Sequence, residues 1–174
     1  MILMNNWITK KIAALLLLVG FFLSGCFVYK FNDAVIPTNV KTVKIGFIEN
    51  RARYVNPQLS PKLTDKLQSK ITGQTKLTRT NNDDADYVIS GAITNYDPSQ
   101  TVGVSAQQAS TNRLTVTVHI VLRKTLDNKV EEFDVSRSFD FSANLTLQQA
   151  EGQLLDEVVR NLTDEIFNRI FNNW

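Results

Sequence analysis

The stretch RLTVTVHIVLRK, residues 113–124, has the most regular alternation of apolar and polar side chains in the sequence. Successive side chains of a β-strand point to opposite faces, so a period of two predicts a strand with one buried face. The residues expected to point into the core are Leu114, Val116, Val118, Ile120 and Leu122. The other face would carry Arg113, Thr115, Thr117, His119, Val121 and Arg123.

A turn and a second strand follow directly. Asp127-Asn128 is typical of a turn, and EEFDVSRSFDFS, residues 131–142, predicts the strand that completes a hairpin. Its apolar side would hold Phe133, Val135, Phe139 and Phe141. Its other side would hold Glu132, Asp134 and Asp140, opposite the cations of the first strand.

Two more strands are expected upstream. KTVKIGFIE, residues 41–49, alternates so that Val43, Ile45 and Phe47 share one face. In ADYVISGAITNY, residues 85–96, the residues that share a face are Tyr87, Ile89, Gly91, Ile93 and Asn95. Asp97-Pro98 is expected to end this strand, because proline cannot donate to a sheet ladder.

A short amphipathic helix is predicted between these two strands. Ser60 followed by Pro61 is typical of an N-cap with proline at the first helical position. Leu63, Leu67 and Ile71 then recur at a spacing of four, which is the period of one helix face. The pattern stops at Gly73, a common residue at helix ends.

A long helix is predicted at the C-terminal end. Thr146 and Gln149 form a capping box, and the apolar pattern continues close to Trp174. Its apolar positions are Ala150, Leu154, Val158, Leu162, Ile166 and Ile170. Since every strand is apolar on one face only, the fold expected is α+β, with two helices packed on one face of a four-stranded, mostly antiparallel sheet.

The N-terminal segment has the pattern of a bacterial lipoprotein signal. Lys10 and Lys11 precede an apolar run over residues 12–23, which is too short to span a bilayer comfortably. Leu-Ser-Gly-Cys, residues 23–26, then matches the lipobox, in which the cysteine thiol is diacylated and the chain is cut before it. Cys26 is therefore predicted to be the acylated N-terminus that anchors the protein to a membrane.

The expected organisation is a signal peptide over 1–25, an acylated N-terminus and tether over 26–39, and a single α+β domain over 40–174. The full chain has 19 Lys+Arg against 17 Asp+Glu, and cleavage would remove two lysines and no acids, leaving 17 of each. A formally neutral domain lacks the basic excess of nucleic-acid-binding proteins. No nucleic-acid partner is expected.

Residues suited to catalysis are scarce. The chain has one histidine and one cysteine, and it lacks the spacing of a nucleophile elbow, a phosphate loop or a Cys/His metal site. His119 lies on a polar strand face, where a solvated role is more common than that of a base. The protein is expected not to be an enzyme, and to have no cofactor and no metal.

The polar strand face is the more promising binding site. Arg113, His119 and Arg123 would form one row that could meet anionic groups such as lipid phosphates. The alternative is that these cations only form cross-strand pairs with the acids of residues 131–142. In the last helix, Phe167 and Phe171 lie off the main apolar stripe and could mark either a partner surface or a wide core-facing stripe.

Taken in order, these segments resemble the LptE-like family of lipopolysaccharide-assembly lipoproteins, in its branch with short mature domains. The segments that carry the resemblance are GCFVYKF (25–31), IPTNVKTVKIGFIEN (36–50), LSPKLTDKL (59–67), ADYVISGAITNYD (85–97), NRLTVTVHIVLR (112–123) and EIFNRIFNNW (165–174). From the first to the last, these segments span almost the whole mature chain.

This resemblance implies an outer-membrane lipoprotein on the periplasmic face, which plugs the lumen of the β-barrel translocon LptD and assists lipopolysaccharide export to the outer leaflet. The implied partners are an LptD-like barrel, lipopolysaccharide and the membrane that holds the acyl chains. The order of strand, helix and ADYVISG strand also resembles the N-terminal domain of TolB-like proteins. That resemblance implies the alternative function, a periplasmic scaffold for other envelope proteins.

Overall fold

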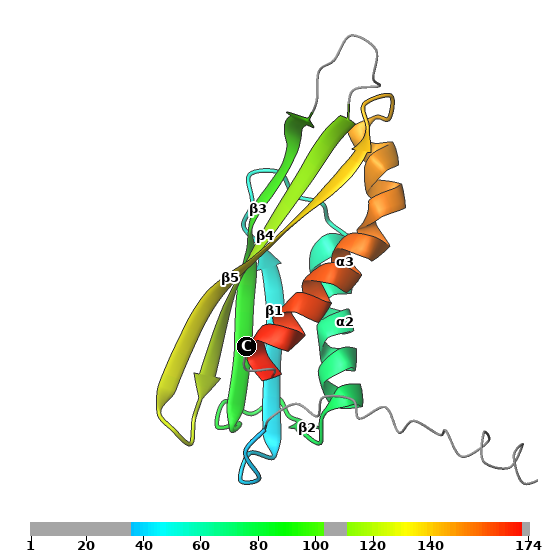
Figure 1. Ribbon diagram of the computed structural model, residues 1–174. Helices are drawn as coiled ribbons and strands as arrows, with labels where there is room; N and C mark the ends of the chain where they lie inside the picture. Colours follow the sequence, from blue (N-terminus) through cyan, green and yellow to red (C-terminus); the bar gives the residue numbers. More distant parts are fainter. Residues whose placement is uncertain (1–35, 103–110, 172–174) are drawn as a thin grey trace, which may run out of the picture. The chain divides into compact units, whose positions relative to one another are not determined.

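A five-stranded sheet carries two helices on one of its faces (Figure 1). The computed structural model describes residues 36–102 and 111–171, with backbone alone for 99–102. The elements in chain order are β1 (Thr42–Asn50), α2 (Leu59–Gln74), β2 (Thr78–Arg79), β3 (Tyr87–Val102), β4 (Thr111–Lys124), β5 (Lys129–Ser142) and α3 (Leu147–Phe171).

The sheet is mixed, so the prediction of four mostly antiparallel strands is wrong in part. The strand order is β2-β1-β3-β4-β5. β1 pairs in parallel with both β2 and β3, whereas β3, β4 and β5 are antiparallel to their neighbours. The expected α+β class and hairpin are confirmed.

The differences have two physical causes. β2 has two residues, which is too short for any alternation to appear in the sequence. The parallel pairing follows from the connection, because β1 and β3 are joined through α2, and a helical crossover returns the chain in the same direction.

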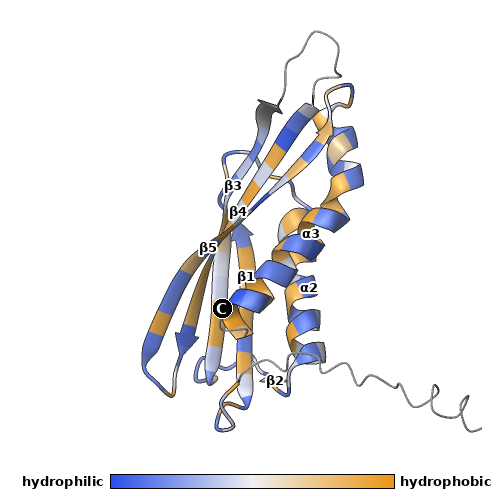
Figure 2. Cartoon of the chain, in the orientation of Figure 1, coloured by the Kyte–Doolittle hydropathy of each residue, from blue (hydrophilic) through white to orange (hydrophobic). Residues whose placement is uncertain are grey.

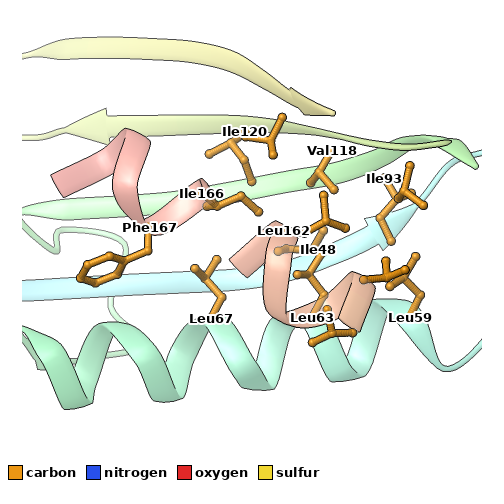
Figure 3. Packing of buried hydrophobic residues seen from close by; sticks show 14 of the residues in the cluster. Ile48, Leu59, Leu63, Leu67, Ile93, Val118, Ile120, Leu162, Ile166 and Phe167 are labelled. Atoms are coloured by element: carbon orange, nitrogen blue, oxygen red, sulfur yellow. The ribbon is translucent and has the colours of Figure 1, made fainter. Parts of the chain in front are cut away.

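The core lies between the sheet and the two helices. The predicted inward residues of β4 are all buried, and both helices turn their apolar sides toward the sheet (Figure 2). Leu63 and Leu67 of α2 meet Leu162 and Ile166 of α3 beneath β1 and β4 (Figure 3). Phe167 and Phe171 are buried as well, so the wide core-facing stripe is the correct interpretation of α3.

An irregularity in β1 overturns the prediction for Phe47. The pairing with β3 shifts register between Ile45 and Ile48, and Ile48 rather than Phe47 enters the core. Phe47 is left 57% exposed. Thr64 of α2 fixes the shifted backbone, since its Oγ1 accepts a hydrogen bond from the Ile48 amide at 3.1 Å.

β3 also differs from its prediction, because Asp97-Pro98 does not end it. The strand continues to Val102 across two register shifts, and the second, between Asp97 and Gln100, accommodates the missing N–H of Pro98. The first shift, between Ile93 and Asn95, turns Asn95 out to solvent and buries Tyr96.

The two helix starts have different outcomes. α3 has the predicted capping box: the Gln149 amide donates to Thr146 Oγ1 at 3.3 Å, and the Thr146 amide donates to Gln149 Oε1 at 2.9 Å. α2 begins two residues earlier than predicted, with Gln58 rather than Ser60 as N-cap. Ser60 is buried inside the first turn, where its hydroxyl has no partner among the described residues.

Candidate functional site

The candidate site is the helix-free face of β4 and β5, called here the outer face. The register places Arg113, Thr115, Thr117 and His119 of β4 directly opposite Asp140, Ser138, Ser136 and Asp134 of β5. Arg113, His119 and Arg123 are thus brought to one face in one row, as the sequence predicts. Cys26, the predicted acylation site, lies outside the described residues.

Arg113 forms a bidentate ion pair with Asp140 at one end of the row. Its Nε and Nη2 donate to the two carboxylate oxygens of Asp140 at 2.6 and 2.9 Å. The hydrogen bond and the charge of Asp140 raise the pKa of Arg113, and Arg113 in turn lowers the pKa of Asp140. Asp140 therefore occupies the Nε and Nη2 donors, which form the edge of the guanidinium that could otherwise bind a phosphate.

The middle of the outer face is a ladder of polar pairs. Thr115 and Ser138 hydroxyls lie 2.9 Å apart, and those of Thr117 and Ser136 lie 3.0 Å apart. His119 comes next, with Nδ1 2.8 Å from the Asp134 carboxylate. Its Nε2 lies 3.6 Å from Glu132 Oε2, so the imidazole stands between two carboxylates.

Arg123, at the other end of the row, has a different kind of partner. Its Nη2 donates to the backbone carbonyl of Asp83 at 2.7 Å. The Asp83 carboxylate accepts a hydrogen bond from Lys44 Nζ, and this bond, together with the charges of Lys44 and Arg123, lowers the pKa of Asp83. Asp83 therefore links β1 to β4, a role that its sequence position in a polar loop does not indicate.

The row's cations are therefore engaged with protein oxygens. A lipid phosphate would have to displace Asp140 to reach the fork of Arg113, or Asp134 to reach Nδ1 of His119. Arg123 has donors beyond the one that holds the carbonyl, because a guanidinium carries five N–H groups. Arg123 is consequently the residue of the row best placed to accept an added anion.

A second polar cluster was not predicted from the sequence. Tyr96 donates its hydroxyl to Glu151 Oε1 at 2.7 Å, and Tyr54 stacks on Tyr96 with ring centroids 5.4 Å apart. Burial, followed by the hydrogen bond to Glu151, raises the pKa of Tyr96. The cluster joins β3 to the start of α3, and the register shift that turns Tyr96 inward could not be found from periodicity.

Metal sites, surface hollows and membrane-spanning helices are the remaining features to consider in residues 36–102 and 111–171. There, no group of three His, Cys, Asp or Glu side chains is arranged to hold a metal ion. A shallow hollow of about 380 Å³ between β5 and α3 is lined by Arg137, Glu157 and Glu165 among others, and Arg137 is ion-paired with Glu165 across it. Neither helix of the described chain is long and apolar enough to span a membrane.

Comparison with known proteins identifies a family. The family model described as LptE, lipopolysaccharide-assembly, matches residues 40–170, which include every strand and almost all of α3. No curated protein matches the sequence.

Several solved structures are similar to this chain at low sequence identity. A neuraminyllactose-binding hemagglutinin homolog from Helicobacter pylori has 8% identity and a TM-score of 0.50, over 78% of this chain and 83% of that chain. A minor lipoprotein from Acinetobacter baumannii has 19% identity and a TM-score of 0.46, over 75% of this chain and 95% of that one. At 8% identity, the likeness to the hemagglutinin homolog concerns the fold alone.

Proposed function

The chain belongs to the LptE family of lipopolysaccharide-assembly proteins, and from this premise we propose that it is an outer-membrane lipoprotein that plugs an LptD-type β-barrel. In this role it assists the barrel in moving lipopolysaccharide to the outer leaflet from the periplasmic side. The observation that carries the proposal is the family match over residues 40–170, which covers the α+β domain rather than a short motif.

Features of the chain support a tethered, non-catalytic role. The lipobox ending at Cys26 would supply the membrane anchor. The domain after it has balanced charge, and its outer face consists of paired polar side chains rather than a catalytic constellation. Such a satisfied polar surface suits contact with the polar lumen of a large barrel.

Co-purification tests the barrel partner. The tagged full-length protein is extracted in mild detergent, and the proteins recovered in stoichiometric amount are identified. A large outer-membrane β-barrel in one-to-one ratio is expected. Recovery of soluble envelope proteins without a barrel would contradict the plug function and favour the TolB-like scaffold.

Direct contact with lipopolysaccharide is proposed for the outer-face row of Arg113, His119 and Arg123. If a phosphate competes with Asp140 for Arg113, then Asp140→Asn frees the guanidinium and tightens binding, by roughly tenfold for one charge-assisted hydrogen bond of about 1.4 kcal/mol. Replacing Arg113 and Arg123 together by Glu is expected to weaken binding. Binding of purified lipopolysaccharide is measured beside the unfolding midpoint of each variant.

The controls separate recognition from folding. Thr117→Ser keeps a hydroxyl on the same face and is expected to leave binding unchanged. If Asp140→Asn binds no more tightly and the double Glu variant loses stability instead of affinity, the cations serve only as cross-strand pairs.

A further inference from the structure

The tip of the β4–β5 hairpin, residues 125–130, exposes two large apolar side chains. Leu126 is 52% and Val130 is 58% exposed. Four large hydrophobic residues of the described chain are more than half exposed, and two of them share this six-residue tip. Single exposed apolar residues are ordinary on protein surfaces, whereas two on one hairpin tip indicate a surface that binds a partner.

The base of the tip is held firmly. Thr125 donates from its amide to the Asp86 carbonyl at 2.8 Å and from its hydroxyl to the Ala85 carbonyl at 2.6 Å. Lys124 and Glu131 close the hairpin below the tip with an ion pair of 2.5 Å. The two apolar side chains are therefore presented from a fixed base, which lowers the entropy cost of contact with a partner.

The tip lies at the end of the sheet where the described chain begins. The register joins Val43, at the start of β1, to Tyr87, Lys124 and Lys129 across the sheet, and Figure 1 shows the hairpin and the start of β1 at the same lower end. Only nine residues, 27–35, separate Cys26 from Ile36. The ten Cα–Cα steps from Cys26 to Ile36 can span at most roughly 36 Å, so an acylated Cys26 keeps this end near the bilayer surface.

The tip also offers a cation to a lipid headgroup. The charges of residues 123–132 balance, since Arg123, Lys124 and Lys129 stand against Asp127, Glu131 and Glu132, and Lys124 is paired with Glu131. Lys129, beside Val130, forms no ion pair with the described residues. Cations beside exposed apolar side chains are the composition of segments that lie in the headgroup region.

We propose that the β4–β5 hairpin tip is a second membrane contact, in which Leu126 and Val130 enter the headgroup region of the bilayer and Lys129 and Arg123 face its phosphates. This inference rests on the acylation of Cys26 that the proposed function includes. Together, the acyl chains and the tip fix how the domain stands on the membrane, which the acyl chains alone leave free to rotate.

Site-specific fluorescence tests the contact in the full-length protein, reconstituted into vesicles that contain phosphatidylglycerol. Cysteine is introduced by Leu126→Cys, or by Val130→Cys in case the first variant folds poorly, and labelled with an environment-sensitive dye. Val55→Cys is the matched control, because Val55 is 52% exposed and lies beyond the opposite end of β1. We expect a quencher attached to the lipid to quench the dye at 126 several-fold more than the dye at 55.

Two results would overturn the inference. One is a dye at 126 that an aqueous quencher reaches as readily as the dye at 55. The other is shielding that appears only when a barrel protein is added, which would make the tip a protein contact. Titration of thiols in the parent protein separates the two premises. A reactive thiol disproves the acylation of Cys26 and, with it, the tip contact. A blocked thiol together with a dye at 126 that remains in water disproves the tip contact alone.

Discussion

Gly91 shows how closely β3 and β4 approach at one residue. A Cβ atom added there would lie 2.5 Å from the backbone oxygen of His119 and 2.8 Å from Cδ1 of Ile120. Backbone cannot move aside as a flexible side chain can, so Gly91→Ala is expected to lower the free energy of unfolding by about 1–3 kcal/mol. Urea denaturation of the purified protein measures this difference.

Gly152 provides the matched control for Gly91. It lies in α3, and apart from its chain neighbours and the adjacent helix backbone no described atom comes within 4 Å of a Cβ built on it. Gly152→Ala is expected to stabilise the protein by about 0.5–1 kcal/mol, because alanine lowers the entropy cost of forming a helix. A Gly91→Ala variant that is as stable as the parent would contradict this close approach of β3 to β4.

Asp86 is expected to make stability depend on pH. Its Oδ2 accepts hydrogen bonds from the amides of Lys41 and Thr42 at 2.8 and 2.9 Å, and these bonds lower its pKa. Since the folded-state pKa lies below the ordinary value of about 3.9, the stabilisation is present above that value and is lost as the pH falls through the folded one.

The variant Asp86→Asn isolates this effect. At about pH 6 it is expected to be less stable than the parent protein by roughly 1 kcal/mol, and the difference should shrink toward about pH 3. Asp84→Asn is the control, because Asp84 is exposed and forms no hydrogen bond with the described residues. A difference for Asp86→Asn that does not change with pH would mean that the charge plays no part.

Among the elements, those governed by local chemistry were predictable. β4 alternates without interruption, and α3 has both partners of its capping box, so sequence alone places their faces and start. β1 and β3 contain register shifts whose position depends on contacts with other elements, such as Thr64 on the Ile48 amide. Phe47 and Tyr96 therefore lie on the opposite faces from those that strict alternation predicts.

The two helix starts offer a paired test of local chemistry. Thr146→Ala removes the hydroxyl that accepts from the Gln149 amide, and a loss of about 1 kcal/mol in the free energy of unfolding is expected. Ser60→Ala removes a buried hydroxyl without a partner in the described chain, so a neutral or slightly stabilising effect is expected. A larger loss of stability for Ser60→Ala than for Thr146→Ala, in thermal or urea unfolding, would contradict this assignment, in which Thr146 caps a helix and Ser60 does not.

For the whole molecule, composition predicts more about location than about contacts. The lipobox and the balanced charge depend on sequence order and counts, which are visible directly. The partners of the outer-face row depend on the β4–β5 register and on a loop some forty residues away, since Arg123 bonds to the Asp83 carbonyl at a sequence separation of 40. The sequence therefore predicts the row of cations and its cross-strand acids, but it does not predict the bond from Arg123 to Asp83.

Membrane attachment is the prediction that belongs to the whole molecule. Several acyl chains on Cys26, each buried methylene contributing about 0.8 kcal/mol, would hold the domain stably on a bilayer. Cys26→Ala removes the acylated atom, so the protein is expected to leave the outer-membrane fraction or to accumulate with residues 1–25 uncleaved. Fractionation of cell envelopes with intact-mass spectrometry distinguishes these two forms. Ser24→Ala is the control: it keeps a small residue in the lipobox and should fractionate as the parent does. A Cys26→Ala protein that stays in the outer membrane, and whose mass differs from that of the parent only by the substitution, would exclude a lipid anchor at this residue.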